Sequence, residues 1–353
     1  KQGSFGRGLT VSLAGLRAGG ALALDGAFQK LRGGDAGAAD SAFAKREARR
    51  FVAELGRLKG TYVKIGQMLA LLGEHFLPPA LSEALHELAA DTEPLPRSTI
   101  EPQLQAALGD RLAELDIAPV AFAAASLAQV HRATVIDTGE EICLKIQYPG
   151  LSRVIDADFD AVVRMLVLAR WVKSGRELDE WLRDLRVQLH HEIDYPREIA
   201  MMEKVAALVS DEADKIEAGG VRYHVPRIYE RYCAEQVIAM EFVDGHLVTH
   251  AEVAWLSQER RNALGRSMLE LFFYELYQWG VLQTDPNFGN YLVRCDGTPD
   301  ELVLLDFGSI LHCEDYFLDH LGNAISAGQQ NDRDLLADSL VGLDCLPADA
   351  SQE

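Results

Sequence analysis

The sequence predicts an α+β fold in which an all-helical unit precedes a small sheet with inserted helices and a second helical lobe. Two patterns carry this prediction. Apolar residues recur at helical spacing over residues 41–76 and again over residues 254–280. Between them, residues 128–135 and 141–147 alternate around the turn Asp137-Thr138-Gly139, as is typical of a β-hairpin. The 353 residues, 48% of them hydrophobic, supply enough apolar surface for two lobes.

The other elements follow from the same periodicities and from their breakers. The run at residues 41–76 is one long helix or two, and Pro78 and Pro79 stop it. Further helices are expected at residues 80–90 and 101–115, and helical spacing occupies most of residues 156–209, interrupted near Pro196. Strands are expected at residues 225–229, 236–242 and 302–305.

The composition excludes one large class of partner. The chain carries 54 acidic against 34 basic side chains, a formal net charge of −20, which repels nucleic-acid backbones. Its five cysteines show no metal-binding or disulfide spacing and indicate a reducing, cytosol-like compartment. The longest charge-free apolar run, residues 117–130, is too short to span a bilayer. We therefore expect a cytoplasmic or peripheral membrane protein, while organellar targeting cannot be judged from a chain that begins at Lys1.

The first 50 residues differ from the rest in charge. They carry nine basic and four acidic side chains, with leucines interspersed among glycines and alanines. Residues 1–40 are therefore interpreted as a leader, either a flexible Gly/Ala-rich segment or one that lies on an anionic membrane surface.

Lys145 is the first candidate site residue. Alternation in the second hairpin strand sends Ile142, Leu144 and Ile146 to one face and Lys145 to the other, where its ammonium group can reach a ligand. Taken alone, the pattern is weak, because a lysine on a half-exposed strand is usually a solvated surface residue.

A carboxylate and a carboxamide follow the long helix of the last lobe. Asp285 and Asn290 stand five residues apart in Asp285-Pro286-Asn287-Phe288-Gly289-Asn290. On a loop they can converge on a phosphate and its cation, with Asp285 near the attacking hydroxyl and Asn290 on the metal. The residue types are also those of an ordinary capped turn.

A third signal decides between these readings. Leu304-Leu305-Asp306-Phe307-Gly308 places a carboxylate, an aromatic ring and a glycine directly after a buried strand, sixteen residues after Asn290. Kinase-type folds use this arrangement to hold Mg²⁺ against the phosphates of ATP. Lys145, then Asp285 and Asn290, then Asp306, in this order, favour phosphoryl-transfer machinery.

A kinase lysine needs a carboxylate partner on a helix. Glu198 shares a helical face with Met202, Val205 and Val209, so it is expected to point inward. A carboxylate on an apolar face needs a cation, and Lys145 can supply it. The alternative is a surface glutamate at a frayed helix start.

Three further segments complete a recognisable set: Lys64-Ile65-Gly66-Gln67, Ala123-Ala124-Ala125-Ser126 and Glu192-Ile193-Asp194. They resemble the K-x-G-Q signature, the alanine-rich nucleotide loop and the E-x-D motif of the UbiB/ADCK (AarF-type) atypical kinases, whose eukaryotic members support coenzyme Q biosynthesis. The resemblance covers roughly residues 41–320, and Glu198 falls where the family's lysine-pairing glutamate lies.

The resemblance implies a bilobal, protein-kinase-like α+β fold. Residues 41–116 are then a helical K-x-G-Q extension, 117–247 an N-lobe with a helical insertion, and 248–353 a C-lobe. It also implies an ATP or ADP site with Mg²⁺, and a role in ubiquinone or other isoprenoid-lipid metabolism at a membrane surface, alongside lipid-biosynthesis proteins.

The implied site residues have distinct roles. Lys145, held by Glu198, orients the α- and β-phosphates, and Asp285 positions or deprotonates the attacking hydroxyl or water. Asn290 and Asp306 ligate Mg²⁺. The remaining implied residues bind the nucleotide through the alanine-rich loop (Ala123, Ala124, Ala125 and Ser126) and the interlobe linker (Glu241 to Val243), or fold the extension over the cleft (Lys64, Gln67, Glu192 and Asp194).

The sequence also departs from ordinary protein kinases. Alanine replaces glycine in the nucleotide loop, which restricts close backbone approach to phosphate. The triplet before the catalytic loop is Gln283-Thr284-Asp285 rather than H-R-D, so activation through a phosphorylated loop is not expected. Residues 309–353 contain no A-P-E sequence, so the peptide-docking platform is missing or cut off.

Two alternatives of other classes stay open. A small-molecule kinase of the choline or aminoglycoside phosphotransferase kind uses the same Asp and Asn chemistry, but it has no use for Lys64 and Gln67. A nucleotide-binding scaffold would bind Mg-ATP without turnover.

Overall fold

The computed structural model describes residues 42–58, 60–70, 76–87, 93–169, 171–172, 176–211, 220–285, 287–297 and 299–347. The expected leader at residues 1–40 lies outside the described residues. The chain divides into two compact units. The first runs to Arg197 and takes in Ile228–Phe242, and the second comprises Glu198–Arg227 and the chain from Val243 onward. Both units contain helices and strands, which confirms the α+β prediction.

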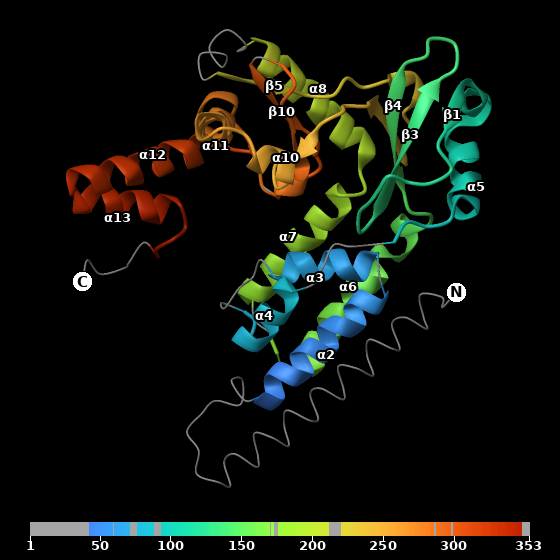
Figure 1. Ribbon diagram of the computed structural model, residues 1–353. Helices are drawn as coiled ribbons and strands as arrows, with labels where there is room; N and C mark the ends of the chain where they lie inside the picture. Colours follow the sequence, from blue (N-terminus) through green and yellow to red (C-terminus); the bar gives the residue numbers. More distant parts are fainter. Residues whose placement is uncertain are drawn as a thin grey trace. The chain divides into compact units, whose positions relative to one another are not determined.

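Helices form one half of the first unit. They are α2 (Ala42–Leu58), α3 (Thr61–Ala70), α4 (Pro79–His86), α6 (Leu151–Leu168) and α7 (Arg176–His191). The predicted run at residues 41–76 contains two helices, separated at Gly60, whose positive φ of 62° favours glycine. Figure 1 shows α2, α3 and α4 beside α6, and buried residues from all five helices form one hydrophobic core.

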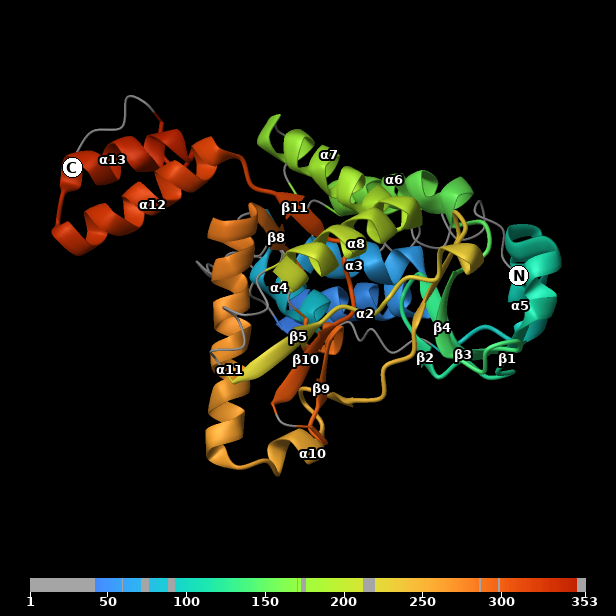
Figure 2. The ribbon, with the colours of Figure 1, turned by 90° about the horizontal axis from the view of Figure 1, so that it is seen from above.

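An antiparallel sheet forms the other half of the first unit. Its strands are β1 (Leu115–Ile117), β2 (Ala123–Ala124), β3 (Ala128–Val135), β4 (Glu141–Gln147) and β6 (Val237–Glu241), in the order β1-β3-β4-β6 with β2 on β3. The predicted hairpin is confirmed with the expected bounds. The predicted helix at residues 101–115 is α5 (Arg97–Leu108), which continues as a 3₁₀ helix, Gly109–Glu114. Figure 2 shows α5 beside this sheet, and the two share a core.

The chain passes into the second unit through α8 (Tyr195–Asp211). A sheet of β5 (Val221–His224), β10 (Asp300–Leu304), β9 (Tyr291–Arg294) and β7 (His246–Leu247) lies there in that order. A separate ribbon pairs β8 (Val281–Gln283) with β11 (Ile310–His312). The helices are α10 (Ala251–Ala254), α11 (Gln258–Phe273), α12 (Asp315–Gln330) and α13 (Arg333–Gly342). Figure 2 shows α11 along β5 and β10, and Figure 1 shows α12 against α13.

Two expectations for this part of the chain are corrected. The strand predicted at residues 225–229 is wrong: β5 ends at His224, because Pro226 has no N–H to donate to a strand ladder. The helix predicted at residues 254–280 is α11 followed by a π-helical turn, Tyr274–Trp279, and it ends at Gly280 with a φ of 61°. Among the described helices, none combines the length and the apolar character that crossing a bilayer requires.

Candidate functional site

Lys145 lies in the middle of the first unit's sheet. In β4 it pairs with Val130 of β3 and Ile238 of β6. Ile142, Leu144 and Ile146 are fully buried in the core under the opposite face, so the alternation expected from the sequence holds. The Lys145 ammonium lies 5.4 Å from the centre of the Tyr195 ring, within the range of a cation–π contact. The lysine is therefore held beside the first residue of α8.

The alanine-rich loop forms the short strand at the edge of β3. Ala123 pairs with Val130 and Ala124 with Gln129, and the Ala125 N–H donates to the Ala128 carbonyl at 2.8 Å. A Cβ placed on Gly60 would lie 3.8 Å from the Ser126 carbonyl oxygen. The turn that precedes α3 therefore packs against this loop.

Lys64 of α3 forms an ion pair with the segment after α7. Its Nζ lies 2.6 Å from Oε1 of Glu192, and the two side chains are only 14% and 19% exposed. Gln67 lies three residues after Lys64 in α3, on the same side of the helix, and is half-buried. Asp194 accepts a hydrogen bond from the Arg197 N–H at 3.1 Å and so caps the start of α8. Lys64, Gln67, Glu192 and Asp194, which are expected to join the extension to the E-x-D segment, thus all lie in the first unit.

Gln147, which sequence reasoning missed, joins this segment to the lysine strand. It is buried, and its Nε2 donates to the Ile193 carbonyl at 2.9 Å. Two residues before it in β4 stands Lys145. The position of the E-x-D segment is therefore fixed to the strand that carries the lysine. A glutamine at the end of an amphipathic strand gives no sequence signal for such a contact.

Asp285, Asn290 and Asp306 come together in the second unit. Asp285 follows β8, Asn290 ends a 3₁₀ turn before β9, and Asp306 follows β10. The Asn290 Nδ2 donates to the Asp285 carbonyl at 3.1 Å, and the Leu305 N–H donates to the Asn290 carbonyl at 3.0 Å. The Asp306 Oδ1 accepts from the Gly308 N–H at 3.0 Å. The Leu305–Asn290 backbone hydrogen bond thus joins the two loops predicted to hold metal and phosphate.

Glu198 approaches the same loop within the second unit. It is 2% exposed, as the apolar face of α8 predicted. A Cβ on Gly308 would lie 3.4 Å from Oδ1 of Asp306 and 3.9 Å from Oε2 of Glu198. Both carboxylates therefore lie within 4 Å of the same point beside Gly308. Neighbouring carboxylates favour a cation.

The donor set fits Mg²⁺ that is shared with a nucleotide. In the part of the chain that the structure describes, no group of three or more His, Cys, Asp and Glu side chains converges as a protein-only metal site. Mg²⁺ typically takes one or two carboxylates and completes its shell with substrate phosphates and water. Asp306 and the amide oxygen of Asn290 suit that pattern.

A half-buried acid that the sequence analysis missed lies beside these residues. Glu275 lines a small cavity with Asn290 and Asp306, and burial raises its pKa to about 7. Its Oε2 accepts from the Gln283 N–H at 3.2 Å. The sequence signal that could have found Glu275 is a charged residue within the long apolar run at residues 254–280.

The segment expected to bind adenine joins the two units. Glu241 ends β6, where it pairs with Ile142, and the division between the units falls between Phe242 and Val243.

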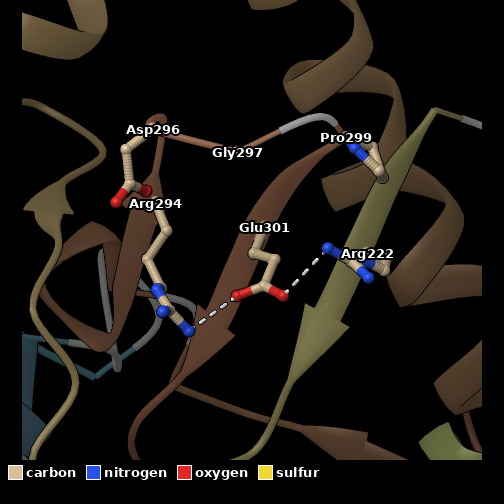
Figure 3. A pocket seen from close by; sticks show the side chains of 6 residues that line it. All are labelled: Arg222, Arg294, Asp296, Gly297, Pro299 and Glu301. Carbon is tan, nitrogen blue, oxygen red and sulfur yellow. Dashed lines mark hydrogen bonds and ion pairs between the residues drawn. The ribbon is translucent and has the colours of Figure 1, made fainter.

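A second cavity is lined by none of the site residues predicted from the sequence. Figure 3 shows Glu301 between Arg222 and Arg294. Its Oε1 lies 3.5 Å from Nη2 of Arg222, and its Oε2 lies 2.9 Å from Nη1 of Arg294. The cavity has a volume of about 180 Å³ and is also lined by Asp296. These charges compensate one another, so the cavity offers no net attraction for phosphate. We do not assign it to the site.

Comparison with known proteins adds independent findings. The model of the ABC1 atypical kinase-like domain matches residues 87–340. The chain is 32% identical over 291 residues to the mitochondrial atypical kinase COQ8B of Rattus norvegicus, covering 81% of this chain and 52% of the relative. It is 30% identical over 274 residues to the mitochondrial atypical kinase COQ8 of Saccharomyces cerevisiae, covering 76% and 52%. The chain thus spans about half the length of these relatives.

One solved structure is similar in both sequence and fold. It is a complex of Rv3197 with erythromycin from Mycobacterium tuberculosis, with a TM-score of 0.55 and 27% identity. The match covers 84% of this chain and 72% of that one.

Proposed function

The chain belongs to the ABC1 family of atypical kinase-like proteins, and from this premise we propose that it binds Mg-ATP and transfers the terminal phosphate to an acceptor or to water. The family and the protein-kinase-like fold expected from the sequence are confirmed. The observation that carries the proposal is the pair of hydrogen bonds at Asn290: its side-chain amide donates to the Asp285 carbonyl, and its own carbonyl accepts from the Leu305 N–H beside Asp306.

In this proposal the second unit supplies the metal and acceptor groups. Asp306 and the Asn290 amide oxygen hold Mg²⁺, which, when bound, neutralises charge on the phosphates. Asp285 orients the acceptor O–H and receives its proton as the bond from γ-phosphorus to the acceptor oxygen forms and the bond to ADP breaks.

A further set of residues binds the nucleotide in this proposal. Lys145 orients the α- and β-phosphates, and Glu198 provides its carboxylate partner. The backbone of Ala123, Ala124, Ala125 and Ser126 lies over the phosphates, and the backbone from Glu241 to Val243 binds adenine. The position of Lys145 in β4, beside Tyr195 at the start of the helix that carries Glu198, supports these roles.

The extension supplies the regulation in this proposal. Lys64, Gln67, Glu192 and Asp194 hold the extension where a protein substrate would otherwise lie. The Lys64–Glu192 ion pair and the contact of Gly60 with the Ser126 loop support this. Such a block favours water or a small lipid as the acceptor over a protein.

We further propose that the protein acts at a membrane surface in a reducing compartment, in ubiquinone or other isoprenoid-lipid metabolism, with lipid-biosynthesis proteins as partners. Its family supports the metabolic role, and the free thiol state of all five cysteines supports the reducing compartment. The mitochondrial names belong to the relatives.

The test compares the wild type with Asp306→Asn in ADP affinity and in ATP hydrolysis, each with and without anionic liposomes. We expect the variant to lose most of the Mg²⁺-dependent affinity and turnover, since one metal carboxylate is gone. The matched control is Asp319→Asn, the same change on the exposed face of α12.

Equal binding and turnover in wild type and Asp306→Asn would contradict the metal role. Higher wild-type turnover with liposomes supports a membrane-associated ATPase. Turnover that appears only with a polar small-molecule acceptor supports the small-molecule kinase instead, and tight Mg-ATP binding without turnover supports the scaffold.

A further inference from the structure

We propose that Gln283 is a positioning residue that fixes Asp285 and Asp306 relative to each other, and that Glu275 anchors it. The inference deepens the proposed function and rests on it. Gln283 takes no direct part in the nucleotide chemistry assigned above.

One side-chain amide bonds to both loops. The Gln283 Nε2 donates to the Asp306 carbonyl at 2.7 Å, and its Oε1 accepts from the Asp285 N–H at 3.2 Å. A planar carboxamide presents a donor and an acceptor at a fixed separation. A displacement of either loop therefore strains the bond to the other. The backbone positions of the acceptor-orienting and metal-binding aspartates are thereby coupled.

The backbone of Gln283 is held by the half-buried Glu275. Its backbone N–H donates to Oε2 of Glu275 at 3.2 Å. Glu275 lies in the π-helical turn Tyr274–Trp279, and π-helical turns are frequent at functional sites. It faces a cavity of about 10 Å³, room for one water at most, whose lining includes Gln283, Asn290 and Asp306. Little space is left for Gln283 to move.

A neighbouring contact provides a structural comparison. The Thr284 Oγ1 donates to the Ser309 carbonyl at 2.6 Å. This bond joins the same two chain segments but ends on neither Asp285 nor Asp306. If the loops need only to be held together, losing the Thr284 bond should matter as much as losing the Gln283 bonds.

The experiment measures how much Mg²⁺ increases the affinity for ADP, as the ratio of Kd in EDTA to Kd in Mg²⁺. Gln283→Glu keeps the acceptor for the Asp285 N–H but loses the donor to Asp306, and Gln283→Met loses both. We expect the ratio to fall about tenfold or more in each, as for other residues that orient metal ligands, with Kd in EDTA nearly unchanged.

The anchor is tested by a conservative and a disruptive change. Glu275→Gln keeps an oxygen for the Gln283 N–H, so most of the Mg²⁺ effect should remain. Glu275→Leu removes that acceptor, so the ratio should fall as in Gln283→Met. This pair decides the question even if Gln283→Met does not fold.

Gln330→Glu on exposed α12 is the surface control and should match wild type. A wild type without any Mg²⁺ effect on ADP affinity overturns the proposed function itself. A normal wild-type ratio that persists in both Gln283 variants overturns only the present inference, as does an equal fall in Thr284→Val.

Discussion

At the scale of single residues, the Lys64–Glu192 pair shows how the exposure of an ion pair decides its contribution to the stability of the fold. The two side chains are 14% and 19% exposed, whereas the comparable pair in the same helical region, Lys45–Glu83, is 46% and 58% exposed. Exposed pairs contribute little because water and salt screen them. Removing one partner of a largely buried pair leaves the other charge without compensation.

We therefore predict that Lys64→Met lowers the free energy of unfolding by about 2 kcal/mol, while Lys45→Met changes it by less than about 0.5 kcal/mol. Urea denaturation of the two variants beside wild type measures both values. Equal losses in the two variants would show that the Lys64 pair is no more than a surface contact.

The site residues were predictable to the extent that their chemistry is local in sequence. Asp306 follows a hydrophobic strand and precedes glycine, and Lys145 alternates with buried neighbours, so both stood out. Gln283 and Glu275 did not stand out. Gln283 matters through its hydrogen bond to Asp306, which lies 23 residues away in the sequence, and Glu275 through the burial that raises its pKa. Neither property is visible in a sequence pattern.

At the scale of elements, the alanine-rich strand β2 carries a prediction about nucleotide choice. Ala124 pairs with Gln129, and its Cβ limits how closely a phosphate can approach the backbone. Ala124→Gly should change the ratio of ATP to ADP affinity, or the hydrolysis rate, by at least about threefold. Titration with each nucleotide and a phosphate-release assay measure this. Unchanged values in all three would remove the loop from the nucleotide site.

The strand β3 carries a prediction about pH. His131 is 1% exposed, its Nδ1 lies 2.8 Å from the Ala118 carbonyl and its Nε2 2.8 Å from Nε2 of Gln129. Burial lowers its pKa below the ordinary 6.5, although the hydrogen bond to Ala118 opposes this. The neutral ring is therefore the form that the fold accommodates.

Because the unfolded chain binds a proton at this histidine more readily than the folded one, stability from His131 is present above pH 6.5 and is lost as the pH falls toward the folded value. Urea denaturation between pH 8 and 5 should show this decline, and His131→Gln should reduce it. A decline of the same size in His131→Gln would assign the effect to other groups.

Elements were predictable where their periodicity was long. The hairpin bounds came out as expected because seven or eight alternating residues stand on each side of its turn. The short strands β5, β7, β8, β9 and β11 have two to four residues each, and apart from the β9–β10 pair their pairing partners are distant in sequence. Their hydrogen bonds, rather than any local pattern, define them.

At the scale of the whole molecule, the chain crosses between its two compact units at Arg197–Glu198, Arg227–Ile228 and Phe242–Val243. Two of these crossings fall at residues with proposed roles: Glu198 as the partner of Lys145, and Glu241 to Val243 at adenine. The net charge of −20 makes paired cations such as Mg²⁺ and Lys145 all the more necessary for binding a polyphosphate.

A crystal structure with Mg²⁺ and a non-hydrolysable ATP analogue tests this account most directly. We predict Mg²⁺ bonded to Asp306 and to the Asn290 amide oxygen at about 2.1 Å, with the Lys145 ammonium against the α- and β-phosphates and the γ-phosphate facing Asp285. A nucleotide bound elsewhere, or bound here with its metal away from Asp306 and Asn290, would contradict it.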